Sequence, residues 1–209
     1  MKGIRNVIFD LGGVIINLDF NRTISEFNRI GQIPFEKIYT QAQQSEIFNL
    51  LDKGKISEAG FFAELKKQIR YNGPDQDLLN AWNALLLDVP EHRLDTLVKM
   101  KQNYSTFLLS NTCEPHITAF EKELKREYGV RNFDDYFDKV YYSCRMGMRK
   151  PDREIFEFVL AENNLKPEET VFIDDSPQHV KGAGECGINA FLLQKNMEME
   201  ELLKQLKLL

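Results

Sequence analysis

The chain has 209 residues, of which 43% are hydrophobic and 28% are charged, and its formal net charge is −5. This composition is typical of a globular protein with a full hydrophobic core, and the lack of a lysine- or arginine-rich block argues against a nucleic acid-binding surface. No apolar stretch approaches the length of a membrane span. We therefore expect no nucleic acid and no membrane among the partners, and the sequence gives no indication of the oligomeric state.

The N-terminal segment and the cysteines bear on the cellular compartment. Basic residues precede an apolar run, but Asp10 interrupts this run too early for the core of a signal peptide. Cys113, Cys144 and Cys186 are odd in number, widely spaced and without a CxxC pair, which is typical of reduced thiols rather than of a disulfide framework. We therefore predict a cytoplasmic protein.

Short apolar runs, each followed by a helical pattern, recur along the chain. They occupy 6–10, 105–110, 139–143, 170–174 and 189–193. Continuous apolar strands that alternate with helices predict a parallel sheet with helices on both faces, which is a Rossmann-like α/β fold. Ligands of such sheets bind at the carboxyl ends of the strands, and three of these runs end in Asp10, Ser110 and Asp174.

The segment 20–88, between the first two strands, is far longer than a crossover connection needs. Apolar residues at three- and four-residue spacing predict helices at 22–30, 34–54, 56–69 and 75–87. We predict a helical cap domain over 20–88, inserted into a catalytic core formed by 1–19 and 89–209. Its aromatic residues fall at helical spacing and are predicted to pack in its interior: Phe48, Phe61, Phe62 and Trp82.

Asp10 stands at the tip of a buried strand, where a carboxylate without a partner is costly. A cation or a catalytic task is therefore expected beside it. Gly12 and Gly13 follow, and they allow a tight turn whose backbone N–H groups can bind an anion, so we predict that both contribute to phosphate binding.

Two further segments carry groups suited to an anionic substrate. Ser110 and Asn111 end a core strand directly before a predicted helix, where a hydroxyl and backbone donors can hold an oxyanion. Lys150 precedes Pro151, which we predict to open a helix over 152–164. We therefore expect Ser110, Asn111 and Lys150 to bind phosphate.

Asp174 and Asp175 form an acidic pair at the end of another strand. Together with Asp10 they form a hard oxygen site suited to Mg²⁺, and Lys150 adds the compact positive charge that phosphate prefers. These groups predict phosphoryl transfer through an aspartyl-phosphate. Asp10 attacks, Mg²⁺ offsets the repulsion between two anions, and Lys150, Ser110 and backbone donors stabilise the transferred charge.

Four motifs, in order and spanning nearly the whole chain, resemble those of the haloacid dehalogenase (HAD) superfamily: FDLGGV, LLSNT, RKPDREIF and VFIDDS. The helical insertion after the first motif matches the position of the C1 cap in this superfamily. Within it, LGGVIINLDFNR and MGMRKPDREIF are most similar to bacterial sugar-phosphate phosphatases of the glucose-1-phosphatase type.

The resemblance implies a role for each matched position. Asp10 corresponds to the nucleophile and first metal ligand, and Gly12 to the residue whose backbone carbonyl binds Mg²⁺. Asp174 and Asp175 match the acidic metal-binding pair, with Asp175 as a direct ligand and Asp174 acting directly or through water. Lys150 matches a phosphate-binding position and also restrains the charge of Asp10.

The first motif departs from that of the family's phosphatases at Gly12, where the resemblance implies a second aspartate that protonates the leaving group. We predict a Mg²⁺-dependent phosphatase for a small phosphorylated metabolite such as a hexose 1-phosphate. A haloacid dehalogenase also uses an aspartate nucleophile and would tolerate Gly12, but that chemistry needs no cation. A third hypothesis is a catalytically weak relative that binds a phosphorylated ligand or a partner.

Other polar residues are predicted to serve the fold. The histidines show no metal-ligand spacing and are predicted to be structural or exposed: His92, His116 and His179. Asp19 and Arg22 are candidates for a contact with the leaving group or for an ion pair beside the cap. Ser57 is a candidate N-cap, and the amphipathic segment 197–209 is predicted to pack as a helix against the sheet.

Overall fold

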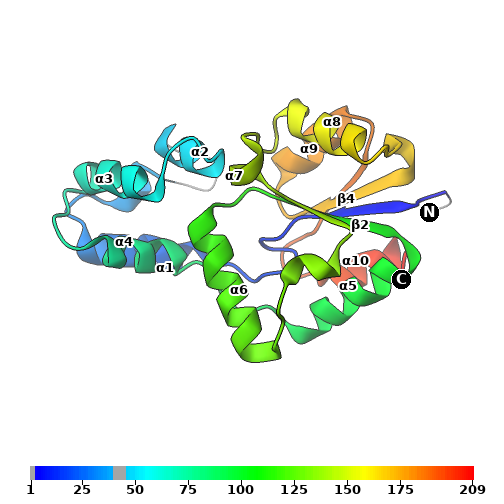
Figure 1. Cartoon of the computed structure of the whole chain (residues 1–209), viewed down its shortest axis with the longest axis horizontal. Helices are drawn as coiled ribbons and strands as arrows, with labels where there is room; N and C mark the ends of the chain where they lie inside the picture. The colour runs from blue at the N-terminus through cyan, green and yellow to red at the C-terminus, as the bar shows by residue number, and fades with distance from the viewer. Residues whose placement is uncertain (1–2, 40–45) are drawn as a thin grey trace.

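The structure is a computed structural model that describes residues 3–39 and 46–209. Its centre is a five-stranded parallel sheet with the order β3-β2-β1-β4-β5 (Figure 1). The strands are β1 (Asn6–Phe9), β2 (Ser105–Ser110), β3 (Lys139–Tyr142), β4 (Thr170–Asp174) and β5 (Asn189–Leu192). Each lies within one residue of its predicted run, because short, continuously apolar segments are buried best inside a sheet that is covered on both faces.

Helices cover both faces of the sheet, which confirms the predicted Rossmann-like fold (Figure 1). One face carries α5 (Glu91–Asn103), α6 (Glu114–Tyr128) and α10 (Met199–Gln205), and the other carries α8 (Arg153–Glu162) and α9 (Pro177–Glu185). Successive strand side chains point to opposite faces, so Val7 and Phe9 pack in the first layer and Ile8 in the second. The C-terminal helix packs against the sheet as predicted, through buried apolar residues.

Pro151 does not open α8, contrary to our prediction. The helix begins at Arg153, with Asp152 at its N-cap position. The backbone N–H and carbonyl of Lys150 are both hydrogen-bonded to the side chain of Asn111, and a residue before proline is disfavoured in helical geometry. Residues 149–152 instead form a turn, in which the Asp152 N–H donates to the Arg149 carbonyl at 3.0 Å, and the helix begins only after it.

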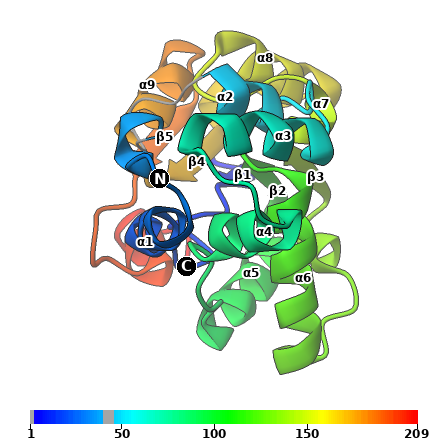
Figure 2. The same ribbon diagram turned by 90° about the vertical axis from the view of Figure 1, so that its left-hand side faces the viewer.

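The long segment after β1 forms a helical insertion beyond the carboxyl ends of the strands (Figures 1 and 2). It comprises α1 (Phe20–Ile30), α2 (Glu46–Asp52), α3 (Glu58–Ile69) and α4 (Asp75–Asn83). These helices surround a hydrophobic cluster of their own. The aromatic residues predicted to pack there are buried: Phe48, Phe61, Phe62 and Trp82. In the described part of the chain, no helix combines the length and apolarity needed to cross a membrane.

The single helix predicted over 34–54 is wrong in its described part. Phe35–Lys37 is a short 3₁₀ turn, and the helix α2 starts only at Glu46; residues 40–45 lie outside the described part. The side chain of Asn28 accepts a hydrogen bond from the backbone N–H of Phe35 at 2.7 Å. This contact fixes a tight turn after α1 where apolar spacing alone predicted a helix.

Two linkers join the insertion to the rest of the chain and lie antiparallel to each other. The backbone N–H of Asn17 donates to the Asp88 carbonyl at 3.0 Å, and the N–H of Leu87 donates to the Asn17 carbonyl at 3.0 Å. Asp19 N–H donates to the Leu85 carbonyl at 2.9 Å. Residues 17–19 and 85–88 are therefore paired where the chain enters and leaves the insertion.

Asp19 ends the first linker and caps α1. Its carboxylate accepts from the backbone N–H of Asn21 at 3.0 Å and forms an exposed ion pair with Arg22 at 3.8 Å. Of the two interpretations of this pair, the ion pair beside the insertion is therefore confirmed.

A buried arginine on α5 braces the first linker. Arg93 donates to the carbonyl of Ile15 at 3.2 Å and to Oδ1 of Asn17 at 3.0 Å. Its guanidinium also binds both carboxylate oxygens of Glu198, at 2.9 and 3.1 Å. Glu198 precedes α10, so this arginine connects the start of the C-terminal helix to the chain that follows β1.

Candidate active site

The carboxyl ends of β1, β2 and β4 bring Asp10, Ser110 and Asp174, respectively, to one edge of the sheet. Their exposed fractions are 6%, 2% and 0%. A cavity of about 760 Å³ lies between this edge and the insertion. Its wall includes Asp10, Gly12, Ser110, Asn111 and Asp175 on the core side, and Tyr39, Asn49, Leu50 and Trp82 on the insertion side. A small molecule in this space would meet the strand ends on one side and the insertion on the other.

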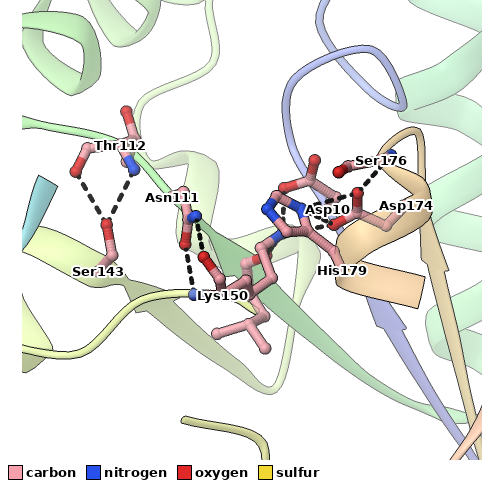
Figure 3. A network of polar contacts seen from close by, with 9 residues as sticks. Asp10, Asn111, Thr112, Ser143, Lys150, Asp174, Ser176 and His179 are labelled. Atoms are coloured by element: carbon pink, nitrogen blue, oxygen red, sulfur yellow. Dashed lines mark hydrogen bonds and ion pairs between the residues drawn. The ribbon is translucent and has the colours of Figure 1, made fainter. Parts of the chain in front are cut away.

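Lys150 is fully buried at the centre of this edge (Figure 3). Its Nζ lies 2.7 Å from Oδ1 of Asp10 and 2.6 Å from Oδ2 of Asp174, and it donates to the Leu109 carbonyl at 2.8 Å. Burial alone would lower the pKa of Lys150, but the two carboxylates outweigh it and raise the pKa above its ordinary value. The ammonium therefore stays charged and holds the two carboxylates in place.

The side chain of Asn111 grips the backbone of Lys150. Its Nδ2 donates to the Lys150 carbonyl at 2.8 Å, and its Oδ1 accepts from the Lys150 N–H at 2.9 Å (Figure 3). In the same loop, the hydroxyl of Ser143 accepts from the N–H of Thr112 and donates to its carbonyl. The amide of Asn111 is thus engaged by the protein itself, which leaves its backbone N–H as the group for the predicted phosphate contact.

Asp174 receives donors on both of its carboxylate oxygens. Besides Lys150, the backbone N–H of Ser176 donates to Oδ1 at 2.8 Å, and Nδ1 of His179 lies 3.0 Å from both oxygens (Figure 3). His179 was predicted to be structural or exposed, and this contact with Asp174 was not foreseen. The sequence signal for this contact is the position of His179 in the first turn of α9. Side chains there tilt toward the N-terminus of the helix, and therefore toward the end of β4.

The three acidic side chains differ in pKa because their surroundings differ. Burial, and then the charge of Asp174, raises the pKa of Asp10 to about 7. The same two causes raise the pKa of Asp175 to about 6. Burial also disfavours the charged form of Asp174, but Lys150 and His179 outweigh this effect and hold its pKa at about 2. The site therefore concentrates negative charge that a cation would relieve.

These carboxylates form a group that fits a divalent metal ion. One oxygen from each of Asp10, Asp174 and Asp175 lies within 4.8 Å of the others. With all three ionised and one lysine ammonium among them, three negative charges and one positive charge leave a net charge of −2. Oxygen donors and this excess charge suit Mg²⁺.

Of the two glycines after Asp10, Gly13 has a steric reason to be glycine. Gly13 has φ +73°, and a Cβ there would overlap the carboxylate of Asp175. The N–H of Gly13 donates to the Ile16 carbonyl at 2.8 Å, so we correct the prediction that this group binds phosphate. A Cβ at Gly12 would meet only the end of the flexible Leu18 side chain, which can move aside. Gly13 therefore makes room for Asp175, while Gly12 lines the cavity.

His116 and Trp82 connect α6 to the insertion at the cavity wall. Their rings stack with centroids 5.0 Å apart, and Nε2 of His116 lies 3.1 Å from the Trp82 carbonyl. Burial lowers the pKa of His116 to about 4, so its ring is neutral at physiological pH. The structural role predicted for His116 agrees with this packing.

Comparison with known proteins defines the class of enzyme. A family model of the haloacid dehalogenase-like hydrolases matches residues 4–187. The chain therefore belongs to this family, as its motifs indicated.

Its relatives include phosphatases. D-ribitol-5-phosphate phosphatase of Bacteroides thetaiotaomicron is 29% identical over 188 residues, which are 90% of this chain and 91% of that protein. Sesquiterpene phosphatase astK of Aspergillus oryzae is 26% identical over 201 residues, which are 95% and 94% of the two chains.

Solved structures match the whole fold. An alanine mutant of the HAD family enzyme BT-2542 from Bacteroides thetaiotaomicron, in complex with magnesium and inorganic phosphate, has a TM-score of 0.87 and 36% identity and covers 96% of this chain and 98% of its own. A protein described as a predicted HAD-like family hydrolase from Porphyromonas gingivalis has a TM-score of 0.88 and 33% identity, and covers 98% of both chains. The predicted family, fold class, phosphatase class and magnesium cofactor are thereby confirmed.

Proposed function

We propose that the protein hydrolyses a small sugar or sugar-alcohol phosphate through an aspartyl-phosphate on Asp10, with residues 20–88 as a cap over the site. The observation that carries this proposal is the position of Lys150, which holds Oδ1 of Asp10 at 2.7 Å beside the carboxylates that suit Mg²⁺. The ribitol 5-phosphate named for the Bacteroides relative supports a polyol or sugar as the leaving group. A hexose 1-phosphate belongs to the same class.

Asp10 supplies the nucleophile. Lys150 occupies Oδ1, so Oδ2 is the oxygen that attacks phosphorus. A bond between Oδ2 and phosphorus forms while the bond from phosphorus to the substrate oxygen breaks, and water then releases inorganic phosphate and restores the carboxylate. Mg²⁺, when bound by Asp10, Asp175 and the backbone carbonyl of Gly12, offsets the negative charge of substrate and carboxylates.

The core side of the cavity also carries groups that can stabilise the transferred phosphoryl group. The hydroxyl of Ser110 lies at the end of β2, directly before α6. The positive end of that helix dipole favours an anion at this place. Asn111 contributes by fixing the backbone of Lys150.

Gly12 leaves the departing oxygen without the acid that the motif of related phosphatases supplies. The leaving group must then take its proton from water, so a stable leaving oxyanion is favoured. A sugar 1-phosphate meets this condition, because its hemiacetal oxygen carries negative charge more readily than a primary alkoxide does. This argument favours the hexose 1-phosphate, whereas the ribitol 5-phosphate named for the relative is an ester of a primary alcohol, and the panel below compares both kinds of ester.

The test is a panel of phosphorylated metabolites assayed for phosphate release with and without Mg²⁺. We expect release from sugar or polyol phosphates that depends on Mg²⁺, and a phosphoryl adduct on the peptide containing Asp10 after rapid quenching. Absence of release from every member of the panel, or an adduct on another residue, would overturn the proposal. Chloride release from a 2-chloro acid without metal would favour the dehalogenase hypothesis instead.

A further inference from the structure

The segment that carries Lys150 is also held by the helical insertion. Arg149, the preceding residue, donates through Nη1 to Oδ1 of Asn49, and its Nη2 forms an ion pair with Asp52 at 3.4 Å. Asn49 and Asp52 lie on α2, one turn apart, so one planar guanidinium can bind both. The catalytic lysine therefore adjoins a residue that is bound to the insertion.

This contact between α2 and the core is close and mostly buried. The side chains of Arg149 and Asp52 are 18% and 14% exposed. Directly after α2, Gly54 has φ +60°, and a Cβ there would overlap the carbonyl oxygen of Cys144 in α7 (Ser143–Met146). Figure 1 shows α2 beside α7. The end of α2 is thus seated on the segment that leads to Arg149 and Lys150.

We propose that Arg149 is a positioning residue that couples the docking of α2 to the position of the Lys150 ammonium. This inference rests on the proposed function. Lys150 is gripped by Asn111 through its backbone and by two carboxylates and a carbonyl through Nζ. The distances of 2.6–2.8 Å from Nζ to its partners are kept only if the backbone of Lys150 stays in place. Arg149 holds the adjoining backbone through its contacts with α2. A misplacement of about 1 Å in such a site can lower the rate by about 100-fold.

The first test compares substitutions of two aspartates in the insertion, Asp52 at the end of α2 and Asp75 at the start of α4. Activity is measured with p-nitrophenyl phosphate as substrate at saturating Mg²⁺. Asp52→Asn removes the charge that Arg149 binds. Asp75→Asn is the matched control, because Asp75 pairs at 2.5 Å with Lys66 inside the insertion. We expect Asp52→Asn to lower kcat by about 10- to 100-fold with little change in KM, and Asp75→Asn to keep kcat within about twofold of the wild type.

A second variant and a second readout separate positioning from folding. Arg149→Lys keeps the charge but loses the planar fork, so we expect it to retain more activity than Arg149→Met. Hydrogen exchange of the peptide spanning 146–152, measured with Mg²⁺ and orthovanadate, should be faster in Asp52→Asn than in the wild type and unchanged in Asp75→Asn.

The outcomes distinguish this inference from the proposed function. A wild-type protein that does not cleave p-nitrophenyl phosphate would contradict the proposed function. If the wild type is active, three results for Asp52→Asn would contradict the proposed role of Arg149 but not the proposed function. These are an unchanged kcat, a change in KM alone, or a loss of kcat no larger than that of Asp75→Asn. Unchanged exchange of the peptide 146–152 in Asp52→Asn would likewise overturn it.

Discussion

The two walls of the cavity are built in different ways. Directly behind the core wall, the buried side chains of Lys150 and Asp174 hold each other and their neighbours within hydrogen-bond distance. On the insertion wall, the indole N–H of Trp82 is directed away from the cavity, to Sγ of Cys113 at 3.3 Å. The backbone carbonyl of Trp82 accepts a hydrogen bond from the hydroxyl of Thr23 at 3.2 Å. The first wall is backed by a fixed network of charges, whereas the second combines apolar side chains with polar ones such as Glu46, Asn49 and Lys55.

This difference separates two tasks. Fixed charges suit the step that every phosphate monoester shares, since transfer of the phosphoryl group needs a nucleophile, a cation and donors at set positions. A wall that combines apolar and polar side chains of the insertion can select among leaving groups by their shape and polarity. Changes on the core wall should therefore alter rates for all substrates, and changes in the insertion should have smaller effects except where α2 contacts Arg149.

The largest expected effect comes from the proposed nucleophile. Asp10→Asn replaces the attacking oxygen with an amide of the same size, so we expect a loss in kcat of at least about 10⁴-fold on every substrate. Asp19→Asn is the matched control, because Asp19 only caps α1 and pairs with Arg22. Steady-state kinetics of both variants decide, and substantial activity in Asp10→Asn would contradict the proposed mechanism.

Asp175→Asn should weaken Mg²⁺ binding by at least about 10- to 100-fold, since it removes a carboxylate from the metal site. The same variant should be more stable than the wild type without metal at pH 7.5. The pKa of Asp175 is raised from 3.8 to about 6 in the folded protein, so its charge destabilises the fold progressively as the pH rises through this window.

Calorimetric titration with Mg²⁺ and thermal unfolding in chelator test both parts of this prediction. The stability gain of Asp175→Asn should shrink between pH 7.5 and pH 4, where Asp175 becomes protonated in the folded wild type. A variant that bound Mg²⁺ like the wild type would remove Asp175 from the metal site.

A smaller effect is expected from the leaving group. Because no acid stands at Gly12, glucose 1-phosphate should turn over at least about tenfold faster than glucose 6-phosphate. Aryl phosphates should show rates that rise steeply as the pKa of the phenol falls. A flat series with phosphorylation of Asp10 as the slow step would show that another group donates the proton.

The smallest effect concerns the insertion alone. Ser57 caps α3 by accepting a hydrogen bond from the Gly60 N–H at 3.1 Å. Ser57→Ala should lower the free energy of unfolding by about 1 kcal/mol and leave kcat for p-nitrophenyl phosphate unchanged. Chemical denaturation and the same assay measure both quantities, and a large loss of kcat would contradict a purely structural role of Ser57.

The fold could be predicted from local patterns in the sequence. The strands are short and apolar, and the polar residues that follow them mark one edge of the sheet, so Asp10, Ser110 and Asp174 could be placed together before the structure was known. The capping role of Ser57 also follows from its position before an apolar helix. Each of these features depends on neighbours close in sequence.

The contacts that complete the site could not be predicted in this way. The amide of Asn111 turns toward the backbone of Lys150, 39 residues away, and His179 reaches Asp174 because α9 folds back over β4. The N–H of Gly13 is taken by the Ile16 carbonyl. These contacts depend on side-chain direction and on loop geometry, which apolar spacing does not encode.

The brace formed by Arg93 has a consequence for the order in which the chain matures. Arg93 binds the linker after β1 and has Glu198 as its counterion, and these two residues are 105 positions apart. During synthesis, which proceeds from the N-terminus, the chain around Asp10, the insertion and most of the sheet are made before Glu198 leaves the ribosome. The backbone hydrogen bonds between the two linkers can therefore form first, and the ion pair of Arg93 with Glu198 is added to them only when the chain is nearly complete.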